Sequence, residues 1–374
     1  MVGTGDVKGG TALGHLNFSP FPCTRKCLAP TLRRMESDPE KDDRRSVRLH
    51  ASGVSYLHQP TASLLALLVL LIGCSKPSNG PRALRFAFIP KALHIPVFEY
   101  ARVGAERAAK QLGGIEVIWR GPESTDEIRQ KELLESFIAQ RVDGIAISCL
   151  NGDLLTDAID RAANAGIPVV TWDSDAPKSR RSAFYGVNDV EAGAALGDGL
   201  AQLIGGRGRV ALITSLGADN LQKRLDGAKQ ALQRYPGIQI VETFDVRDDA
   251  VRVAEVIASA AQRYPDLDGW LSVGGWPVFV RNALDPIDPA HTKVVAFDTI
   301  PPAPDLLRAG KVQLLVGQKY FGWGEESVKL LKRIIAGDRP SNPYQYSGMD
   351  VVTRDNLDAY LQQWARWAGG EPSH

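Results

Sequence analysis

Three apolar segments of this sequence each end at a polar side chain that could bind a ligand. Residues 167–172 stop at Asp173, residues 294–297 stop at Asp298, and residues 314–317 stop at Gln318. This pattern is typical of a buried parallel strand whose carboxyl end opens into a crevice, and open α/β sheets bind their ligands at that end. Carboxylates accept hydrogen bonds and an amide both donates and accepts, so these side chains suit a ligand rich in hydroxyl groups.

The first of these strand ends carries two carboxylates, Asp173 and Asp175. Taken alone, Asp173 could instead cap the turn that follows the strand. Because the same pattern recurs at Asp298 and Gln318, we interpret it as a ligand contact.

Short apolar strands alternate with helical segments along most of the chain. Strands are expected near 83–90, 115–119, 144–149, 167–172, 182–186, 209–213, 238–244, 269–273, 293–297, 313–318 and 349–352. Helices are expected near 96–112, 124–138, 153–166, 189–204, 220–234, 248–263, 277–284, 303–309, 321–336 and 354–367, with a capping box at 124–127 and Asp153 as a cap. Strict alternation predicts parallel sheets with right-handed crossovers. The number of strands favours two doubly wound α/β lobes over a single sheet.

Length and charge limit the classes of protein that fit. The 374 residues exceed what one core ordinarily supports, which agrees with two lobes. Residues 1–74 hold 9 Lys and Arg against 6 Asp and Glu, which leaves 35 against 37 in the remainder, a net charge of −2. A near-neutral body argues against nucleic acid as a partner.

The four cysteines do not have the spacing of a disulfide framework. Cys23 and Cys27 could suggest half of a metal site, but no second pair follows them, and we expect no metal. Cys149 ends a predicted strand and is expected to be a small buried apolar residue.

The segment before the first strand has the features of a secretion signal. Residues 64–72 are almost wholly apolar but too short to span a bilayer, which suits a signal-peptide core. They run into Leu71-Ile72-Gly73-Cys74, which resembles the lipobox of bacterial lipoproteins, and the resemblance implies that Cys74 is lipidated. Residues 1–74 are thus expected to be leader, with 1–46 untranslated and a start near Val47, and residues 75–82 a tether.

Several motifs in order carry a resemblance to a known family. They lie at 95–98, 104–109, 142–145, 166–170, 186–189, 224–228 and 294–298, within a matching region of about residues 84–352. Together they resemble a periplasmic sugar-binding protein of the ribose-binding type, an extracytoplasmic receptor of ABC importers. The resemblance implies a type I periplasmic binding protein fold, in which two α/β lobes joined by three chain crossings close on a ligand like a hinge. Carried over, lobe one is 83–185 plus 320–346 and lobe two is 186–318 plus 347–374.

The resemblance also implies roles for individual residues. Asp173, Asp298 and Gln318 match polar ligand contacts of the family, and Phe98 matches an aromatic residue that stacks on the sugar ring. Two positions depart from the ribose type, because Ile95 replaces an Asn and Ser174 replaces an Arg, so ribose itself is not the expected ligand.

Further ligand contacts are expected on both lobes. Asn220 and Gln222 fall near the second-lobe contact region, where the family usually has an Arg. Gly275 lets the backbone approach a ligand, and Trp276 is expected to face it rather than only cover the lobe. His94 lies in the predicted cleft loop, where it could donate or accept a hydrogen bond.

Lys91 and the paired Asp173 and Asp175 also resemble the autoinducer-2 receptor branch of the family, where a Lys and Asp residues hold a small polyhydroxylated furanose. A signal receptor of that kind, or one that feeds a membrane sensor, therefore stays open as an alternative. A lac-repressor-type regulator shares the fold, but residues 1–60 show no helix-turn-helix pattern. No dinucleotide loop or hydrolase motif is present, which argues against an enzyme.

The expected function is capture of a small sugar or polyol between two lobes and delivery to a membrane ABC permease. The protein is expected to lie on the periplasmic side of the cell envelope, to be held there by the lipid anchor, and to act as a monomer without a cofactor.

Overall fold

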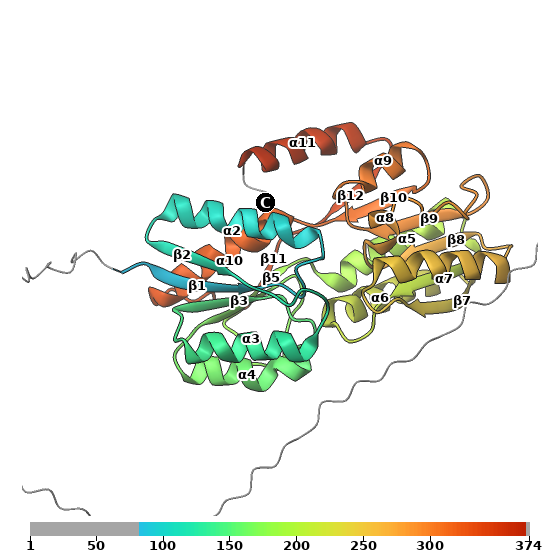
Figure 1. The fold of residues 1–374 in the computed structure, drawn as a ribbon. Helices are drawn as coiled ribbons and strands as arrows, with labels where there is room; N and C mark the ends of the chain where they lie inside the picture. The colour runs from blue at the N-terminus through green and yellow to red at the C-terminus, as the bar shows by residue number, and fades with distance from the viewer. Residues whose placement is uncertain (1–81, 372–374) are drawn as a thin grey trace, which may run out of the picture. The chain divides into compact units, whose positions relative to one another are not determined.

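The computed structural model describes residues 82–371, and it contains two six-stranded sheets with helices on their faces (Figure 1). The predicted leader, the lipidation of Cys74 and residues 75–81 of the tether lie outside the described residues. The predicted fold class, two parallel-sheet α/β lobes, is confirmed.

The first sheet has the strand order β11-β5-β4-β3-β1-β2, and all its strand pairs are parallel. Its strands are β1 (Leu84–Ile89), β2 (Ile115–Trp119), β3 (Gly144–Ile147), β4 (Val169–Trp172), β5 (Ala183–Gly186) and β11 (Tyr344–Tyr346). Its helices are α2 (Val97–Leu112), α3 (Glu127–Ala139), α4 (Gly152–Asn164) and α10 (Tyr320–Ile335).

The second sheet has the order β12-β10-β9-β8-β6-β7. Its strands are β6 (Arg207–Thr214), β7 (Gly237–Asp245), β8 (Gly269–Ser272), β9 (Lys293–Phe297), β10 (Leu314–Gly317) and β12 (Asp350–Thr353). The remaining helices are α5 (Asp189–Leu203), α6 (Asp219–Gln233), α7 (Ala250–Arg263), α8 (Trp276–Phe279), α9 (Ala303–Arg308) and α11 (Leu357–Gly369).

Alternation along the strands of the first sheet divides its core between two helix layers. Phe86 and Phe88 of β1 belong to the cluster that includes α2 and α10, whereas Ala87 and Ile89 belong to the cluster that includes α3 and α4. Successive side chains of a strand point to opposite faces, so a strand covered on both faces is apolar throughout.

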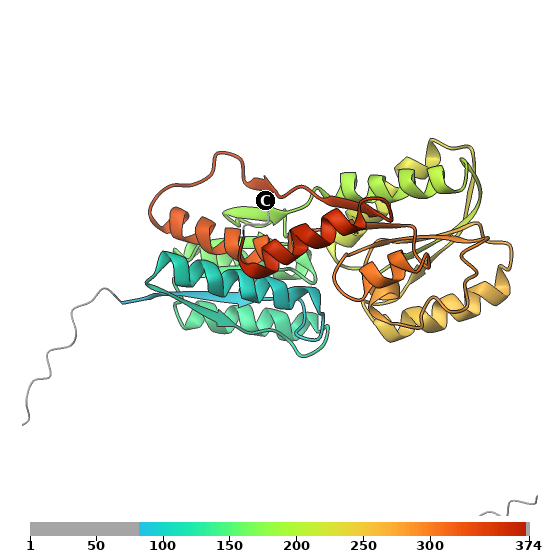
Figure 2. The ribbon, with the colours of Figure 1, turned by 90° about the horizontal axis from the view of Figure 1, so that it is seen from above.

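The chain passes between the two sheets after β5, after β10 and after β11. The last of these passages leads to β12 and then to α11, which lies beside α2 (Figure 2). Arg107 of α2 donates to the carbonyl of Trp367 at 2.7 Å, and the ring centroids of Tyr100 and Trp364 lie 5.0 Å apart.

The structure corrects several local predictions. β12 pairs antiparallel with β10, and β11 was not predicted as a strand. The helix expected at 277–284 is the four-residue α8. The side chains that cap α3 and α4 belong to Asp126 and Asn151, so residues 124–127 do not act as the predicted box and Asp153 is not the cap. Cys149 is buried, as expected, and burial raises the pKa of its thiol.

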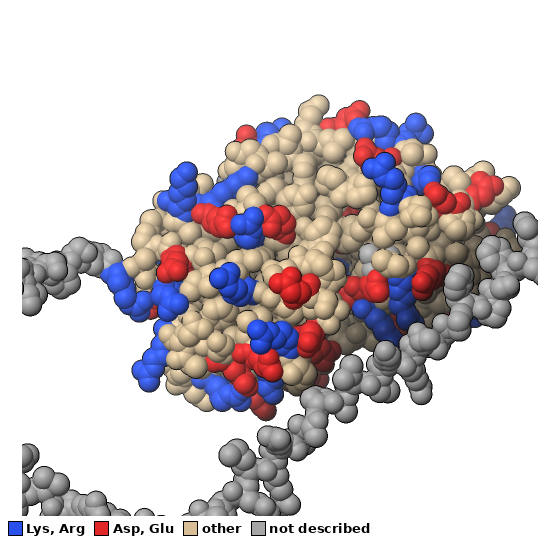
Figure 3. All heavy atoms as spheres, in the orientation of Figure 1, with Lys and Arg blue, Asp and Glu red and all other residues tan. Residues whose placement is uncertain are grey.

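Basic and acidic side chains are mixed over the face drawn in Figure 3. Several pair within one helix, as where Arg102 bonds to both Glu99 and Glu106 on α2.

Glycines let one pair of helices pack closely beside each sheet. A Cβ atom on Gly104 of α2 would collide with the carbonyl oxygen of Phe321, and one on Gly324 of α10 would collide with that of Ala101. The pair α5 and α6 repeats the arrangement, because Gly193 lies against the carbonyl of Arg224 and Gly227 against that of Val190.

We therefore predict that Gly324→Ala destabilises the protein by about 2 kcal/mol or more, because a methyl group would force two packed backbones apart. The measurement is chemical denaturation followed by circular dichroism. Gly369→Ala is the matched control, since its Cβ would meet nothing within 4 Å in α11. Equal stability of the two variants would show that α2 and α10 can move apart with little loss of free energy of unfolding.

Candidate binding site

A cavity of about 300 Å³ lies where the carboxyl ends of strands from both sheets meet. From the first sheet, Lys91 follows β1 and Asp173 follows β4. From the second, Asp298 follows β9 and Gln318 follows β10. The full lining is Lys91, His94, Ile95, Pro96, Val97, Phe98, Asp173, Asn220, Leu221, Arg224, Asp248, Gly274, Gly275, Trp276, Phe279, Asp298 and Gln318.

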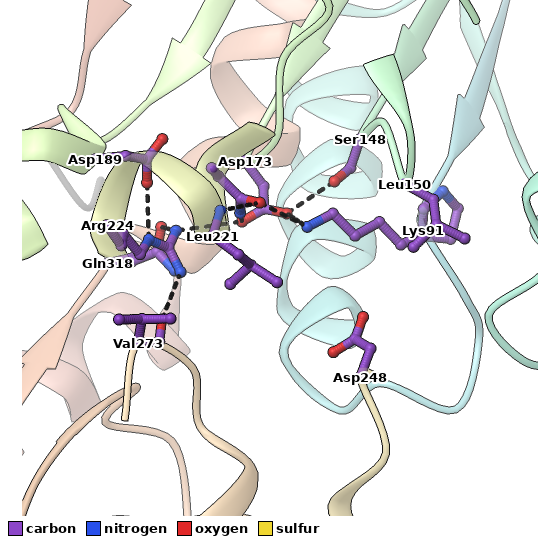
Figure 4. A network of polar contacts seen from close by, with 12 residues as sticks. Lys91, Ser148, Leu150, Asp173, Asp189, Leu221, Arg224, Asp248, Val273 and Gln318 are labelled. Carbon is purple, nitrogen blue, oxygen red and sulfur yellow. Dashed lines mark hydrogen bonds and ion pairs between the residues drawn. The ribbon is translucent and has the colours of Figure 1, made fainter. Parts of the chain in front are cut away.

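Asp173 is the centre of a buried polar network (Figure 4). Its Oδ2 accepts a hydrogen bond from Ser148 Oγ at 2.8 Å and lies 3.4 Å from Lys91 Nζ. Its Oδ1 accepts from Asn220 Nδ2 at 3.3 Å and lies 3.8 Å from Arg224 Nη2. Lys91 also donates to Asn220 Oδ1 at 3.0 Å, so contacts run between the residues of the two sheets.

Arg224 extends this network into the second sheet. The residue is 2% exposed. Its guanidinium donates to Asp189 Oδ1 at 2.8 Å and to Gln318 Oε1 at 3.2 Å, and lies 3.9 Å from the centroid of the Phe297 ring. Burial raises the pKa of Asp189 to about 7, although the adjacent Arg224 acts in the opposite direction. A buried arginine keeps its charge, so Asp189 serves as its counter-ion behind the cavity.

Asp298 has fewer partners than Asp173. Its Oδ1 accepts from the Tyr320 hydroxyl at 3.0 Å. Burial raises the pKa of Asp298 to about 6, against the opposing effects of Arg224 and of hydrogen bonds from Tyr320 and Gln318. The pKa of Tyr320 is itself raised well above its usual value, first by burial and then by the charge of Asp298.

Three carboxylates that line the cavity share an uncommon backbone conformation. The φ angles of Asp173, Asp248 and Asp298 are 59°, 55° and 72°. These values lie in the left-handed region, which residues other than glycine rarely adopt. Asp tolerates this region better than most residues, but the conformation still costs free energy. Such strain gathers at ligand-binding sites, where it holds a side chain in a direction that regular strand geometry would not give.

Aromatic side chains contribute to the apolar part of the lining, beside the aliphatic residues. Phe98 packs edge-on against Trp172, with ring centroids 5.4 Å apart, and this contact holds the ring in place. Trp276 and Phe279 lie on the short helix α8. Trp276 donates from Nε1 to Asp248 Oδ1 at 2.7 Å.

The glycine at position 275 is required by its neighbours. A Cβ atom there would lie 2.6 Å from Asp298 Oδ2 and would also collide with the Phe279 ring. The absence of a side chain thus brings the backbone of the α8 loop directly against the Asp298 carboxylate.

The structure brings most of the predicted site residues together. Those that line the cavity are Lys91, His94, Phe98, Asp173, Asn220, Gly275, Trp276, Asp298 and Gln318. Two lie outside the lining. Asp175 turns away to bond with Thr171 and Arg181, the latter at 2.6 Å, and Gln222 donates to Asp226 on the exposed side of α6.

Sequence reasoning missed Arg224, Asp248 and Phe279 as cavity residues. The motif at 224–228 contained a signal for Arg224, since an Arg is usual in the second-lobe contact region, but Asn220 and Gln222 were chosen in its place. Asp248 follows a strand, as Asp173 and Asp298 do, but Val246 and Arg247 separate it from the end of β7.

Within residues 82–371, His, Cys, Asp and Glu side chains form no group of three that could hold a metal ion. In the same part of the chain, every helix is too short or too polar to cross a bilayer.

We predict that Asp298 makes stability depend on pH. A carboxyl whose pKa is raised by folding contributes stability that is fully present below about pH 4 and is lost as pH rises through about 6. At 1.36 kcal/mol per pH unit, the change from 3.8 to about 6 corresponds to roughly 3 kcal/mol.

Between pH 4 and pH 7, the free energy of unfolding of the wild type should therefore fall by about 3 kcal/mol more than that of Asp298→Asn. Urea unfolding across that range measures the difference. Asp355→Asn, at an exposed position outside the cavity, should follow the wild type. Parallel curves for wild type and Asp298→Asn would contradict the raised pKa.

Comparison with known proteins agrees with this geometry. Residues 86–339 match the model of the periplasmic binding protein domain. A solved ABC transporter solute-binding protein from Burkholderia graminis C4D1M, in complex with D-arabinose, is 33% identical, with a TM-score of 0.70 over 75% of this chain and 99% of that one.

Two curated relatives show the same similarity in sequence alone. The D-allose-binding periplasmic protein of Escherichia coli K12 is 25% identical over 70% of this chain and 88% of its own. The xylose/arabinose-binding protein XylF of Sulfolobus acidocaldarius is 23% identical over 74% of this chain and 73% of its own. With a family match over most of its length and the cavity between its sheets, this chain belongs to the periplasmic binding protein family.

Proposed function

We propose that this protein is an extracytoplasmic receptor that captures a small sugar or polyol in the cavity and delivers it to a membrane ABC permease. The observation that carries the proposal is the cavity itself. It places two carboxylates and an amide at three strand ends, beside the aromatic rings of Phe98 and Trp276. Polar acceptors suit sugar hydroxyls and aromatic faces suit the C–H face of a sugar ring.

The named ligands of the relatives support the same class. D-arabinose, D-allose, xylose and arabinose are all small neutral sugars, and they appear in the descriptions of proteins that match most of this chain. Two departures from the ribose type favour another ligand. Ile95 lines the cavity but its side chain offers no hydrogen bond, and Ser174 lies outside the lining.

The lobes of the proposed receptor are 83–185 plus 320–346 and 186–318 plus 347–374. Lys91 and Asp173 belong to the first lobe and Asn220 to the second, so their hydrogen bonds join the lobes. A ligand that contacts both lobes favours a closed arrangement by its differential contacts, which is hinge closure. Anchorage through Cys74 completes the proposal, since it would keep a monomeric receptor at the membrane beside its permease.

The proposal is tested first by thermal shift against pentoses, hexoses, inositols and linear polyols. A ligand that binds only the folded state raises the melting temperature by mass action. One clear hit supports the proposal and names the ligand class, whereas no shift across the panel counts against a sugar receptor.

For a ligand found in this way, Asp298→Ala should weaken binding about tenfold to a hundredfold, because a hydrogen bond to a charged group contributes roughly 1.5–3 kcal/mol. Isothermal titration calorimetry measures the change. Gln222→Ala is the control and should bind as the wild type does, since its side chain lies outside the cavity. Unchanged affinity in a folded Asp298→Ala protein would refute the assignment of this site.

A further inference from the structure

The charges of the cavity do not balance within the protein. Asp173 has Lys91 at 3.4 Å and Arg224 at 3.8 Å, and Arg224 also serves Asp189 at 2.8 Å. Both cations of the lining are thus held by the buried carboxylates at its base. Asp248 and Asp298 line the same cavity, and neither forms an ion pair with any residue between 82 and 371.

Asp248 is the less satisfied of these two carboxylates. Asp298 takes hydrogen bonds from Tyr320 and Gln318. Asp248 takes one on Oδ1 from the Trp276 indole, and no described side chain donates to Oδ2. In Figure 4 it projects from its loop toward the region of Lys91 and Asp173, and no dashed line joins it to the residues drawn.

The position of Asp248 is held from two directions. Its φ of 55° follows one of 53° at Arg247, so two successive residues are in the left-handed region after β7. The hydrogen bond from Trp276, on a different loop, then fixes the orientation of the carboxylate. The left-handed backbone costs free energy, and such strain gathers where the direction of a side chain is used.

The surroundings of Asp248 suit a cation. The rings of Trp276, Phe279 and Phe98 line the same cavity, and aromatic faces attract ammonium groups. An apolar lining also strengthens an ion pair by excluding water. A neutral sugar could donate a hydroxyl hydrogen bond to Asp248 but would bring no positive charge as it displaces water from the carboxylate, and removing water from an unpaired charge costs free energy.

We propose that the cavity takes a polyhydroxylated ligand that carries a protonated amine, such as an amino sugar, an aminocyclitol or an amino polyol, and that Asp248 is the residue that pairs with the amine. This inference rests on the proposed sugar or polyol function and narrows its ligand class. Asp173, Asp298 and Gln318 bind hydroxyl groups, and Asp248 with the Trp276 ring selects the cationic substituent.

The experiment is calorimetric titration with matched pairs that differ in one substituent. The pairs are glucosamine and glucose, galactosamine and galactose, 1-amino-1-deoxysorbitol and sorbitol, and an aminocyclitol and its parent inositol. In at least one pair the amine should bind about tenfold tighter or more than its parent, because a charge-assisted hydrogen bond replaces a neutral one. The N-acetyl derivative of that amine, which is neutral, should lose this advantage.

Asp248→Asn tests the residue. The substitution removes the charge but keeps a carbonyl oxygen that can accept from Trp276 Nε1, so the loop retains its contact. It should bring the affinity ratio of amine to parent close to one. Asp355→Asn, which removes an exposed carboxylate outside the cavity, is the matched control and should keep the wild-type ratio.

Each outcome decides between the two proposals. Parents that bind while no amine binds more tightly would overturn the amine inference and leave the sugar receptor standing. If Asp248→Asn still binds the amine more tightly than its parent, Asp248 is not the residue that pairs with the amine. Failure of every amine and every parent to bind would count against both proposals.

Discussion

A buried guanidinium organises the site of this protein. Arg224 is 2% exposed and cannot shed its charge, so the chain must supply partners for it in the interior. Those partners come from separate segments, because Asp189 begins α5, Gln318 follows β10 and Val273 follows β8. Asp173, from the other sheet, completes the set at 3.8 Å. The strand ends that form the cavity thus converge on one fixed cation.

The position of Arg224 depends in turn on a backbone contact. Gly193 and Gly227 allow α5 and α6 to approach until the carbonyl of Arg224 lies against Gly193. Asp189 is four residues before Gly193 and therefore lies on the same side of α5, within reach of the guanidinium. A methyl group at either glycine would separate the helices and lengthen that ion pair. The close packing of α5 against α6 and the ion pair between Arg224 and Asp189 therefore depend on the same two glycines.

The carboxylates of the cavity illustrate how stability and binding can oppose each other. Asp298 has a raised pKa because burial removes water from its charge, and its backbone is in the left-handed region. Both features cost stability in the unliganded protein. Hydroxyl or ammonium donors of a ligand would supply the hydrogen bonds that these carboxylates lack in the unliganded protein. Groups held in place in this way can then contribute to affinity and selectivity when the ligand binds.

The amino-acid sequence by itself determined the α/β class, the two sheets and the positions of Asp173, Asp298 and Gln318. Each of these depends on a local signal, namely the period of apolar residues and the point at which an apolar strand stops. Phe98 and Lys91 came instead from the family resemblance, although they lie close to β1 and α2 in the chain. The resemblance also supplied the second-lobe region, whereas Trp276 was expected from its place after two glycines at a strand end.

Only the tertiary structure decided which neighbours of those residues face the cavity. Asn220 and Gln222 are two positions apart on α6, so they point in different directions, and Arg224, four positions after Asn220, shares its face. Asp175 is two residues from Asp173 but is drawn away by Arg181. Asp248 reaches the cavity because its loop folds in left-handed conformation and bonds to Trp276, 28 residues later. Such choices depend on contacts between distant segments, and the periodicity of one segment holds no information about them.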